Sequence, residues 1–131
     1  PVPYQARELL GSAARGLLEA YATPDPARRY ATAHLAALRA AAAVLAARAH
    51  PVRQSGRIRS VWALLPVVAP QMQEWAAFFA ANATRRAAAD AGLPVVSQRE
   101  ADDLVRDAES FLVQVAAVIG VDQQAILPNE F

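Results

Sequence analysis

The 131-residue sequence contains no cysteine, which excludes disulfide bonds and metal sites built from thiolates. It also contains no lysine, so all 13 basic side chains are arginines, a preference that we attribute to coding bias. Valine, isoleucine and threonine are too scattered to supply the alternating runs of β-strands. Because hydrophobic residues make up 55% of the chain and many of them are alanine, the best helix former, the sequence predicts an all-α protein.

Long apolar runs are also missing. The longest are Ala40–Ala47 and Val61–Ala69, and the second contains Pro66. Neither approaches the roughly 18–20 residues that a bilayer-spanning helix needs, so no membrane partner is expected. The N-terminus lacks the basic and then apolar layout of a secretory signal. With the absence of cysteine, these features predict a cytoplasmic protein.

Acidic residues are absent from one long segment of the chain. The net charge is only +1, yet no aspartate or glutamate lies between Asp25 and Glu74. The basic side chains of that segment are Arg28, Arg29, Arg39, Arg48, Arg53, Arg57 and Arg59. From Glu74 onward there are nine acids and four arginines. The basic half could bind phosphate, but the simpler expectation is that the two halves pair within a bundle or across a dimer.

Apolar residues at helical spacing predict an antiparallel bundle of four principal helices and one short connecting helix. The first principal helix is expected over about Tyr4–Tyr21. The second is expected over about Pro26–Ala49, because Asp25 suits the N-cap position and Pro51 prevents the helix from continuing. Proline at the first position of this helix costs no hydrogen bond.

Both faces of the second predicted helix are apolar. One face carries Ala31, His34, Leu35, Leu38, Ala41, Ala42, Leu45 and Ala49, and the opposite face carries Ala36, Ala40, Ala43, Val44 and Ala47. A helix that is apolar all round is usually central in its fold or packed against another chain. The pattern therefore leaves two interpretations open, a central helix and a homodimer.

A short helix over Val61–Leu65, capped by Ser60, is expected to connect the second and third principal helices. The third is predicted over Pro70–Ala91, with Gly92 as its C-terminal stop. Its buried face consists of Met72, Trp75, Phe78 and Phe79.

The fourth principal helix begins at a capping box of sequence Ser-Gln-Arg-Glu at residues 97–100. In such a box the Ser97 side chain binds the amide of Glu100, and the Glu100 side chain reaches back to the amide of Ser97. An uninterrupted apolar stripe follows the box, and Gly120 ends the helix.

Five stretches of the sequence bear on its family: Arg29–Ala40, Ser60–Leu65, Trp75–Phe79, Arg85-Arg86 and Glu100–Leu104. In this order and spacing they resemble HEPN domains, and specifically a small Ala/Arg-rich HEPN family of high-GC bacteria, the SAV type. The resemblance covers roughly residues 5–120. One departure is that Ser60–Leu65 lacks the histidine of the "His-x-Leu" segment that follows the second helix in HEPN domains.

The resemblance implies an antiparallel helical bundle that often dimerises. Relatives include RNA-cleaving toxins of toxin–antitoxin type, partners of nucleotidyltransferases, and many members with no demonstrated chemistry. Catalytic members carry an arginine and, after four to six intervening residues, a histidine, near the start of the last core helix. There the pair serves metal-independent RNA cleavage, which needs a proton-transfer group near neutral pH and a cation that stabilises the developing phosphorane.

Arg29 and His34 match this spacing, but they lie in the second predicted helix, and the last helix has no histidine. Positions five apart on a regular helix are separated by about 140° around its axis. His34 lies on the buried stripe, whereas Arg29 points the other way. The sequence therefore favours a packed core histidine, and an endoribonuclease that uses Arg29 and His34 is the alternative.

No metal or cofactor is expected. His50, just before Pro51 at a predicted helix end, suits a capping role in which its charge complements the helix dipole. Two isolated histidines with no carboxylate at ligand spacing do not form a metal site. The sequence also has no Gly-rich phosphate loop and no serine in a nucleophile motif.

Asn82 and Arg86 continue the stripe of the third predicted helix where apolar residues are expected, and with Arg85 they form a polar patch. One interpretation is that these groups are solvated or pair with Asp102 or Asp103. The other is a cleft for phosphate or for a partner, because arginine makes bidentate contacts to oxyanions.

A predicted loop contains three further arginines, Arg53, Arg57 and Arg59. These side chains are either solvated or in contact with a nucleic-acid backbone.

We expect a single HEPN-like domain over residues 1–131, with a core at about 5–120 and a tail at 121–131. The favoured function is a non-catalytic module that binds a protein partner or nucleic acid, and a homodimer is expected. The alternatives are the endoribonuclease and a purely structural helical adaptor.

Overall fold

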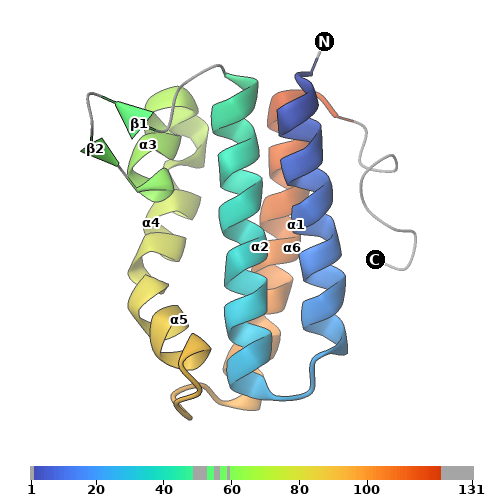
Figure 1. Ribbon diagram of the computed structural model, residues 1–131, viewed down its shortest axis with the longest axis vertical. Coiled ribbons are helices and arrows are strands. Elements are labelled where there is room, and N and C mark those ends of the chain that lie inside the picture. Colours follow the sequence, from blue (N-terminus) through green and yellow to red (C-terminus); the bar gives the residue numbers. More distant parts are fainter. Residues whose placement is uncertain (1, 49–52, 55–56, 59, 122–131) are drawn as a thin grey trace.

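Three long helices and a column of shorter ones form an antiparallel helical bundle (Figure 1). The computed structural model describes residues 2–48, 53–54, 57–58 and 60–121. Its elements are α1 (Tyr4–Ala22), α2 (Pro26–Ala47), β1 (Arg53–Gln54), β2 (Arg57–Ile58), α3 (Val61–Val68), the 3₁₀ turn η1 (Pro70–Met72), α4 (Gln73–Ala81), α5 (Ala83–Asp90) and α6 (Gln98–Ile119). The prediction of an all-α bundle is confirmed, since β1 and β2 are only a two-residue antiparallel pair.

The long helix α2 lies at the centre of the bundle and packs against α1, α3, α5 and α6. Figure 1 shows α1, α2 and α6 side by side, with the column of α3, α4 and α5 on the other side of α2. Columns that follow one another in the chain run in opposite directions, whereas α2 and α6, which pack against each other, run in the same direction. This arrangement brings α4 and α5 alongside α6, and the candidate site lies between them.

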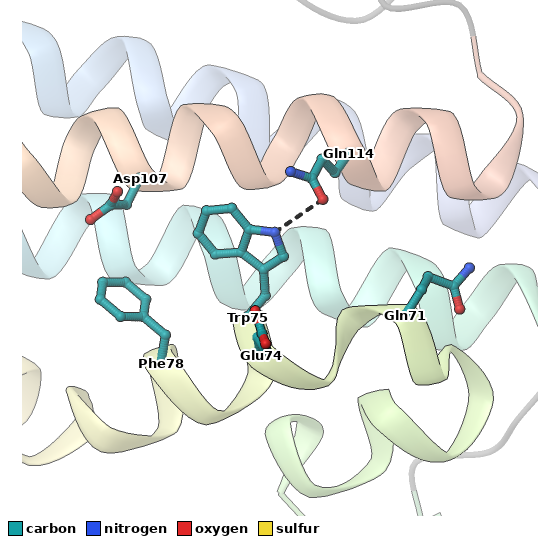
Figure 2. Close-up of a pocket in the computed structure, with 6 residues that line it drawn as sticks. All are labelled: Gln71, Glu74, Trp75, Phe78, Asp107 and Gln114. Carbon is teal, nitrogen blue, oxygen red and sulfur yellow. Dashed lines mark hydrogen bonds between the residues drawn. The ribbon is translucent and has the colours of Figure 1, made fainter.

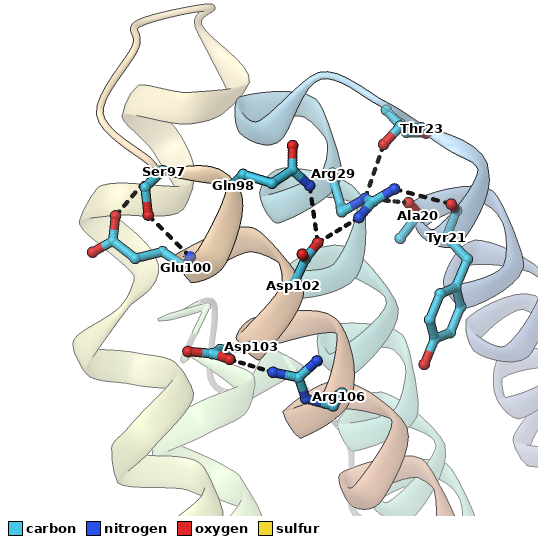
Figure 3. Close-up of polar contacts among 10 residues, drawn as sticks. All are labelled: Ala20, Tyr21, Thr23, Arg29, Ser97, Gln98, Glu100, Asp102, Asp103 and Arg106. Atoms are coloured by element: carbon cyan, nitrogen blue, oxygen red, sulfur yellow. Dashed lines mark hydrogen bonds and ion pairs between the residues drawn. The ribbon is translucent and has the colours of Figure 1, made fainter.

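Local side-chain chemistry determines where α2 and α6 begin. The Asp25 carboxylate accepts a hydrogen bond from the amide of Arg28 at 3.0 Å, so Asp25 is the N-cap of α2. The capping box of α6 is also present: Ser97 Oγ accepts from the Glu100 amide at 3.1 Å, and the Glu100 carboxylate accepts from the Ser97 amide at 2.9 Å (Figure 3). At the other end of α6, Gly120 adopts a left-handed conformation with φ of 84°.

The third principal helix is not continuous, contrary to the prediction. The segment expected as one helix over residues 70–91 consists of η1, α4 and α5, and the chain leaves the regular α-helical path at Asn82. The Asn82 side chain donates to the carbonyl of Phe78 at 2.8 Å and accepts from the Tyr30 hydroxyl at 3.1 Å. Asparagine favours such breaks because its side chain competes with the backbone for hydrogen bonds.

Small residues allow α1 and α2 to approach each other closely. A Cβ atom added to Gly16 would lie 3.4 Å from the Cβ of Ala36. Three alanines of the second predicted face, Ala36, Ala40 and Ala43, are fully buried, and the fourth, Ala47, is half-buried. Leu35, predicted on the buried stripe, is 39% exposed. The interpretation of α2 as a central helix is therefore confirmed. Most of its alanines are covered by helices of the same chain, so this pattern does not require a dimer.

The close contact between α1 and α2 leads to a prediction on stability. Ala36→Leu should lower the free energy of unfolding by about 1–3 kcal/mol, because the larger side chain forces α1 away from α2. Ala87→Leu, at an exposed position of α5, is the matched control and should change stability by about 0.5 kcal/mol or less. Urea unfolding measures both. Equal effects of the two substitutions would contradict the close packing of α1 on α2.

One described helix, α2, has the length and hydropathy of a helix that could cross a membrane. Of that apolar stretch, 61% is buried inside the bundle. The central helix of a bundle needs the same composition, so length and hydropathy are only a weak indication here.

Candidate functional site

Arg29 joins three parts of the fold. Its Nε donates to the carbonyl oxygens of Ala20 and Thr23 at 3.1 and 2.9 Å, and its Nη2 donates to that of Tyr21 at 3.1 Å. Its Nη1 forms an ion pair with Asp102 at 2.5 Å (Figure 3). The guanidinium therefore connects the end of α1 and the following turn to α6, and only 18% of its side chain is exposed.

Asp102 is held as a carboxylate by two neighbours. Its Oδ1 accepts a hydrogen bond from Nε2 of Gln98 at 3.0 Å in addition to the ion pair with Arg29 (Figure 3). These two contacts lower the pKa of Asp102, with the Gln98 hydrogen bond as the larger cause. At this position an arginine of the basic half, Arg29, pairs within the bundle with an aspartate of the acidic half, Asp102, as the charge distribution of the sequence predicted.

His34 lies in the aromatic core and is 1% exposed. Its Nε2 is 2.9 Å from the carbonyl oxygen of Phe79, so Nε2 carries the proton and donates it. The imidazole meets the rings of Trp62 and Phe79 edge-on, with centroids 6.0 and 5.7 Å away. Burial lowers the pKa of His34, because the charged imidazolium loses its hydration. His34 is therefore a neutral core residue near pH 7.

The lowered pKa predicts how stability depends on pH. The unfolded chain takes up a proton at His34 near pH 6.5, whereas the folded chain does so only at lower pH. The contribution of His34 to the free energy of unfolding is fully present above about pH 6.5, and it is lost as the pH falls from there toward the pKa of His34 in the folded state. In urea unfolding between pH 7.5 and 5, His34→Gln should flatten this decline, because glutamine does not titrate. An unchanged slope in the variant would contradict the assignment.

The choice of pH range separates His34 from the paired carboxylates. The pKa of Glu100 is lowered by hydrogen bonds from the Ser97 amide and from Arg85, and that of Asp102 is lowered as described above. A carboxyl group with a lowered pKa loses its stabilising effect only as pH falls below its unfolded value, which is 4.5 for glutamate and 3.8 for aspartate. Both losses therefore occur below the range used for His34.

Arg29 and His34 do not share a site in this structure. Arg29 is bound by Asp102 and by carbonyl oxygens at the end of α1, and His34 is bound by Phe79 in the core. Metal-independent RNA cleavage needs both groups at one phosphate. The geometry provides no such arrangement.

The structure brings together two members of the predicted polar patch, Asn82 and Arg85. Both line a cleft of about 250 Å³ between α5 and α6, and the other residues of its lining are Tyr30, Phe78, Glu100, Asp103, Leu104 and Asp107. Arg85 pairs with Glu100 at 2.7 Å. Arg86 does not line this cleft and lies half-buried on α5.

The predicted partners of the patch, Asp102 and Asp103, are already engaged. Asp102 pairs with Arg29, and Asp103 pairs with Arg106 one turn along α6. Arg85 reaches Glu100 instead, so the predicted partners were wrong although the patch does pair with α6.

The predicted loop with its three arginines is described only in part. The backbones of Arg53 and Arg57 belong to β1 and β2. The side chains of Arg53 and Arg57 lie outside the described residues, as do Arg59 and His50 altogether. Their predicted roles therefore stay predictions.

A second cleft, which the sequence did not predict, lies between α4 and α6 (Figure 2). It has a volume of about 470 Å³, and it is lined by Gln71, Glu74, Trp75, Phe78, Asp107 and Gln114. Trp75 reaches from α4 toward α6, and its Nε1 donates to Oε1 of Gln114 at 3.1 Å. Phe78 is 37% exposed, so its predicted place on the buried face is wrong.

A signal for this cleft was present in the sequence. Phe78 and Phe79 are adjacent, and adjacent positions on a helix are about 100° apart around the axis. Two neighbouring aromatic rings cannot both point along one narrow stripe. Phe79 is fully buried, so Phe78 lies at the edge of the core.

The two clefts share Phe78 and Asp107, and we call them together the α4–α6 groove. Its acidic side chains are Glu74, Glu100, Asp103 and Asp107, and the one arginine in its lining, Arg85, is paired. Among the described residues, no hydrogen bond or ion pair reaches the Asp107 carboxylate. Burial and the nearby charge of Asp103 raise the pKa of Asp107. The groove therefore combines exposed aromatic surface with uncompensated negative charge.

The described part of the chain contains no group of three histidine, cysteine, aspartate or glutamate side chains placed to hold a metal ion.

In comparisons with known proteins, the SAV_6107-like HEPN family model matches residues 20–116, which is most of the chain. No curated protein and no solved structure gives a significant match. The matched segment contains α2 to α5 and most of α6, and with them every residue of the α4–α6 groove.

Proposed function

The chain belongs to the SAV_6107-like HEPN family, as its sequence predicted, and from this premise we propose that it is a non-catalytic module that binds a protein partner in the α4–α6 groove. The observation that carries the proposal is the groove itself. A half-exposed phenylalanine and an unpaired carboxylate lie together in a hollow of about 470 Å³. Exposed aromatic side chains in concave sites are typical of surfaces that bind other molecules.

The charge of the groove supports a protein over a nucleic acid. The groove has four carboxylates, of which Glu100 and Asp103 are paired with arginines. The other two, Glu74 and Asp107, have no ion-pair partner among the described residues and repel phosphate. Two arginines of the basic half also have structural contacts: Arg29 binds Asp102, and Arg48 donates to the carbonyl of Val68 at 2.8 Å. These contacts leave less of the basic half available for a phosphate backbone.

The surroundings of His34 support a non-catalytic module. A general acid or base must lie within hydrogen-bond reach of the reacting group. His34 is buried beneath Trp62 and Phe79 and gives its ring proton to a backbone carbonyl. A substrate phosphate could reach it only if the aromatic core opened.

Homodimerisation stays a prediction from the family resemblance. Light scattering on the purified protein would give twice the mass of one chain if it is correct. The buried alanines of α2 are covered by helices of the same chain, so a dimer contact would have to use other residues.

Photo-crosslinking tests the proposed function. The residue p-benzoylphenylalanine would replace Phe78 in the groove or, as a control, Tyr4 on α1, which is 77% exposed. In an extract of the source cells, we expect a crosslinked product from position 78 that protease removes and nuclease does not. Position 4 should give none. A nuclease-sensitive product, equal products at both positions, or no product at position 78 would overturn the proposal.

An RNA assay separates the proposal from the enzymatic alternative. The purified protein should leave total RNA intact. RNA cleavage that is abolished both by Arg29→Lys and by His34→Gln, with a surface variant such as Glu8→Gln still active, would favour the endoribonuclease.

A further inference from the structure

We infer that the α4–α6 groove binds its partner through a cationic side chain, an arginine in preference to a lysine, held by Trp75, Phe78 and the Asp107 carboxylate. This inference rests on the proposed function, because it assumes that the partner is a protein docked in the groove. It adds the chemical class of the side chain that the groove recognises.

The aromatic residues form a fixed wall of the groove. Trp75 stacks on the buried ring of Phe79 with centroids 5.8 Å apart, and its indole N–H is held by Gln114. Phe78 meets Trp75 edge-on, with centroids 6.2 Å apart. The faces of such rings attract a cation that comes within about 6 Å. Because Trp75 is already held in place, binding would cost little side-chain entropy there.

The carboxylate of Asp107 lies beside this wall, next to Phe78 (Figure 2). It is partly buried, and no described residue donates a hydrogen bond to it. Arg106, which directly precedes Asp107 on α6, pairs with Asp103 instead. A cation from a partner would donate hydrogen bonds to Asp107 and offset the charges of Glu74 and Asp107.

The size of the groove favours a side chain over a simple ion. A volume of about 470 Å³ lies in the range of about 300–1,000 Å³ that is usual for pockets that hold organic groups. Arginine suits this space better than lysine, because its planar guanidinium can stack on an aromatic ring and bind a carboxylate with two N–H groups at once.

The test uses two synthetic alanine-based helical peptides, one with a central arginine flanked by leucines and its twin with citrulline, the neutral isostere, at that position. The protein has two tryptophans, so its NMR spectrum contains two indole N–H signals. We expect the arginine peptide to shift the signal of Trp75. Trp62 is only 6% exposed, and its signal is the internal reference.

Citrulline in the peptide and Asp107→Asn in the protein should each weaken binding by about ten-fold or more, because each removes a charge-assisted contact. Glu8→Gln, an exposed carboxylate on α1, carries the same change of charge away from the groove and should leave binding unchanged. Phe78→Ala is a second variant, and thermal unfolding checks that each variant is folded.

The outcomes distinguish the inference from the proposed function. Equal binding of the two peptides at Trp75, or undiminished binding to Asp107→Asn, would overturn the cationic anchor and leave the groove as a docking site. No shift of Trp75 with either peptide would also overturn it, even if crosslinking at position 78 succeeds. Failure of that crosslinking would overturn the proposed function by itself.

Discussion

Phe79→Ala should lower the free energy of unfolding by about 3–5 kcal/mol, the largest effect that we expect from a single substitution. The Phe79 ring is fully buried and stacks on Trp62 with centroids 5.1 Å apart. It also contacts Trp75 and Phe111, at 5.8 and 5.2 Å between centroids. Its removal would leave a cavity at the point where α2, α3, α4 and α6 meet. Because small domains have a stability of about 5–15 kcal/mol, this loss would bring the protein close to unfolding.

The neighbouring phenylalanine provides the control. Phe78→Ala removes a side chain of the same kind that is 37% exposed, so it should cost much less. Urea unfolding followed by circular dichroism would measure both variants. Equal losses for the two would show that Phe78 belongs to the core, and would remove the aromatic edge from the α4–α6 groove.

Arg29→Met should lower the free energy of unfolding by about 2–4 kcal/mol, because it removes a nearly buried guanidinium that binds a carboxylate and three carbonyl oxygens. Methionine keeps the apolar stem but donates no hydrogen bond. The effect should appear as a lower urea midpoint with an unchanged slope against denaturant. If Arg29 were instead a residue reserved for binding phosphate, its removal would change the stability little.

Arg106→Met is the matched control for this ion pair. Arg106 pairs with Asp103 on the surface of α6, where the two side chains are 66% and 51% exposed. Exposed pairs of this kind contribute about 0–1 kcal/mol, because water and salt screen them. A cost for Arg106→Met as large as that for Arg29→Met would contradict the structural role that we assign to Arg29.

The starts of α2 and α6 could be predicted because they depend on neighbours in sequence. Asp25 caps α2, and the box of Ser97 and Glu100 caps α6, each through hydrogen bonds that span three residues. The burial of His34 was also predictable, because its position on the helix places it among apolar residues. In these cases the local chain contains both partners of the interaction or the whole periodic pattern.

Two features could not be predicted in this way: the break at Asn82, and which of the adjacent rings of Phe78 and Phe79 is the exposed one. Asn82 ends α4 while it also binds Tyr30, which is 52 positions away in the chain. Phe78 and Phe79 are equally apolar, and only the positions of α2 and α6 decide which of the two rings is covered. The partner of Arg85 likewise depended on Asp102 and Asp103 being engaged elsewhere.

By itself, the sequence determined that this protein is helical, where α2 and α6 begin, that both faces of α2 are apolar, and that the chain resembles HEPN domains. Alanine content, apolar periodicity and capping residues act within a few turns of helix, so they can be recognised in the linear sequence. Only the tertiary structure decided that Arg29 binds Asp102 across 73 residues and that Trp75, Phe78 and Asp107 share one groove. These side chains come from helices far apart in the chain, so their arrangement exists only after α4 has packed along α6.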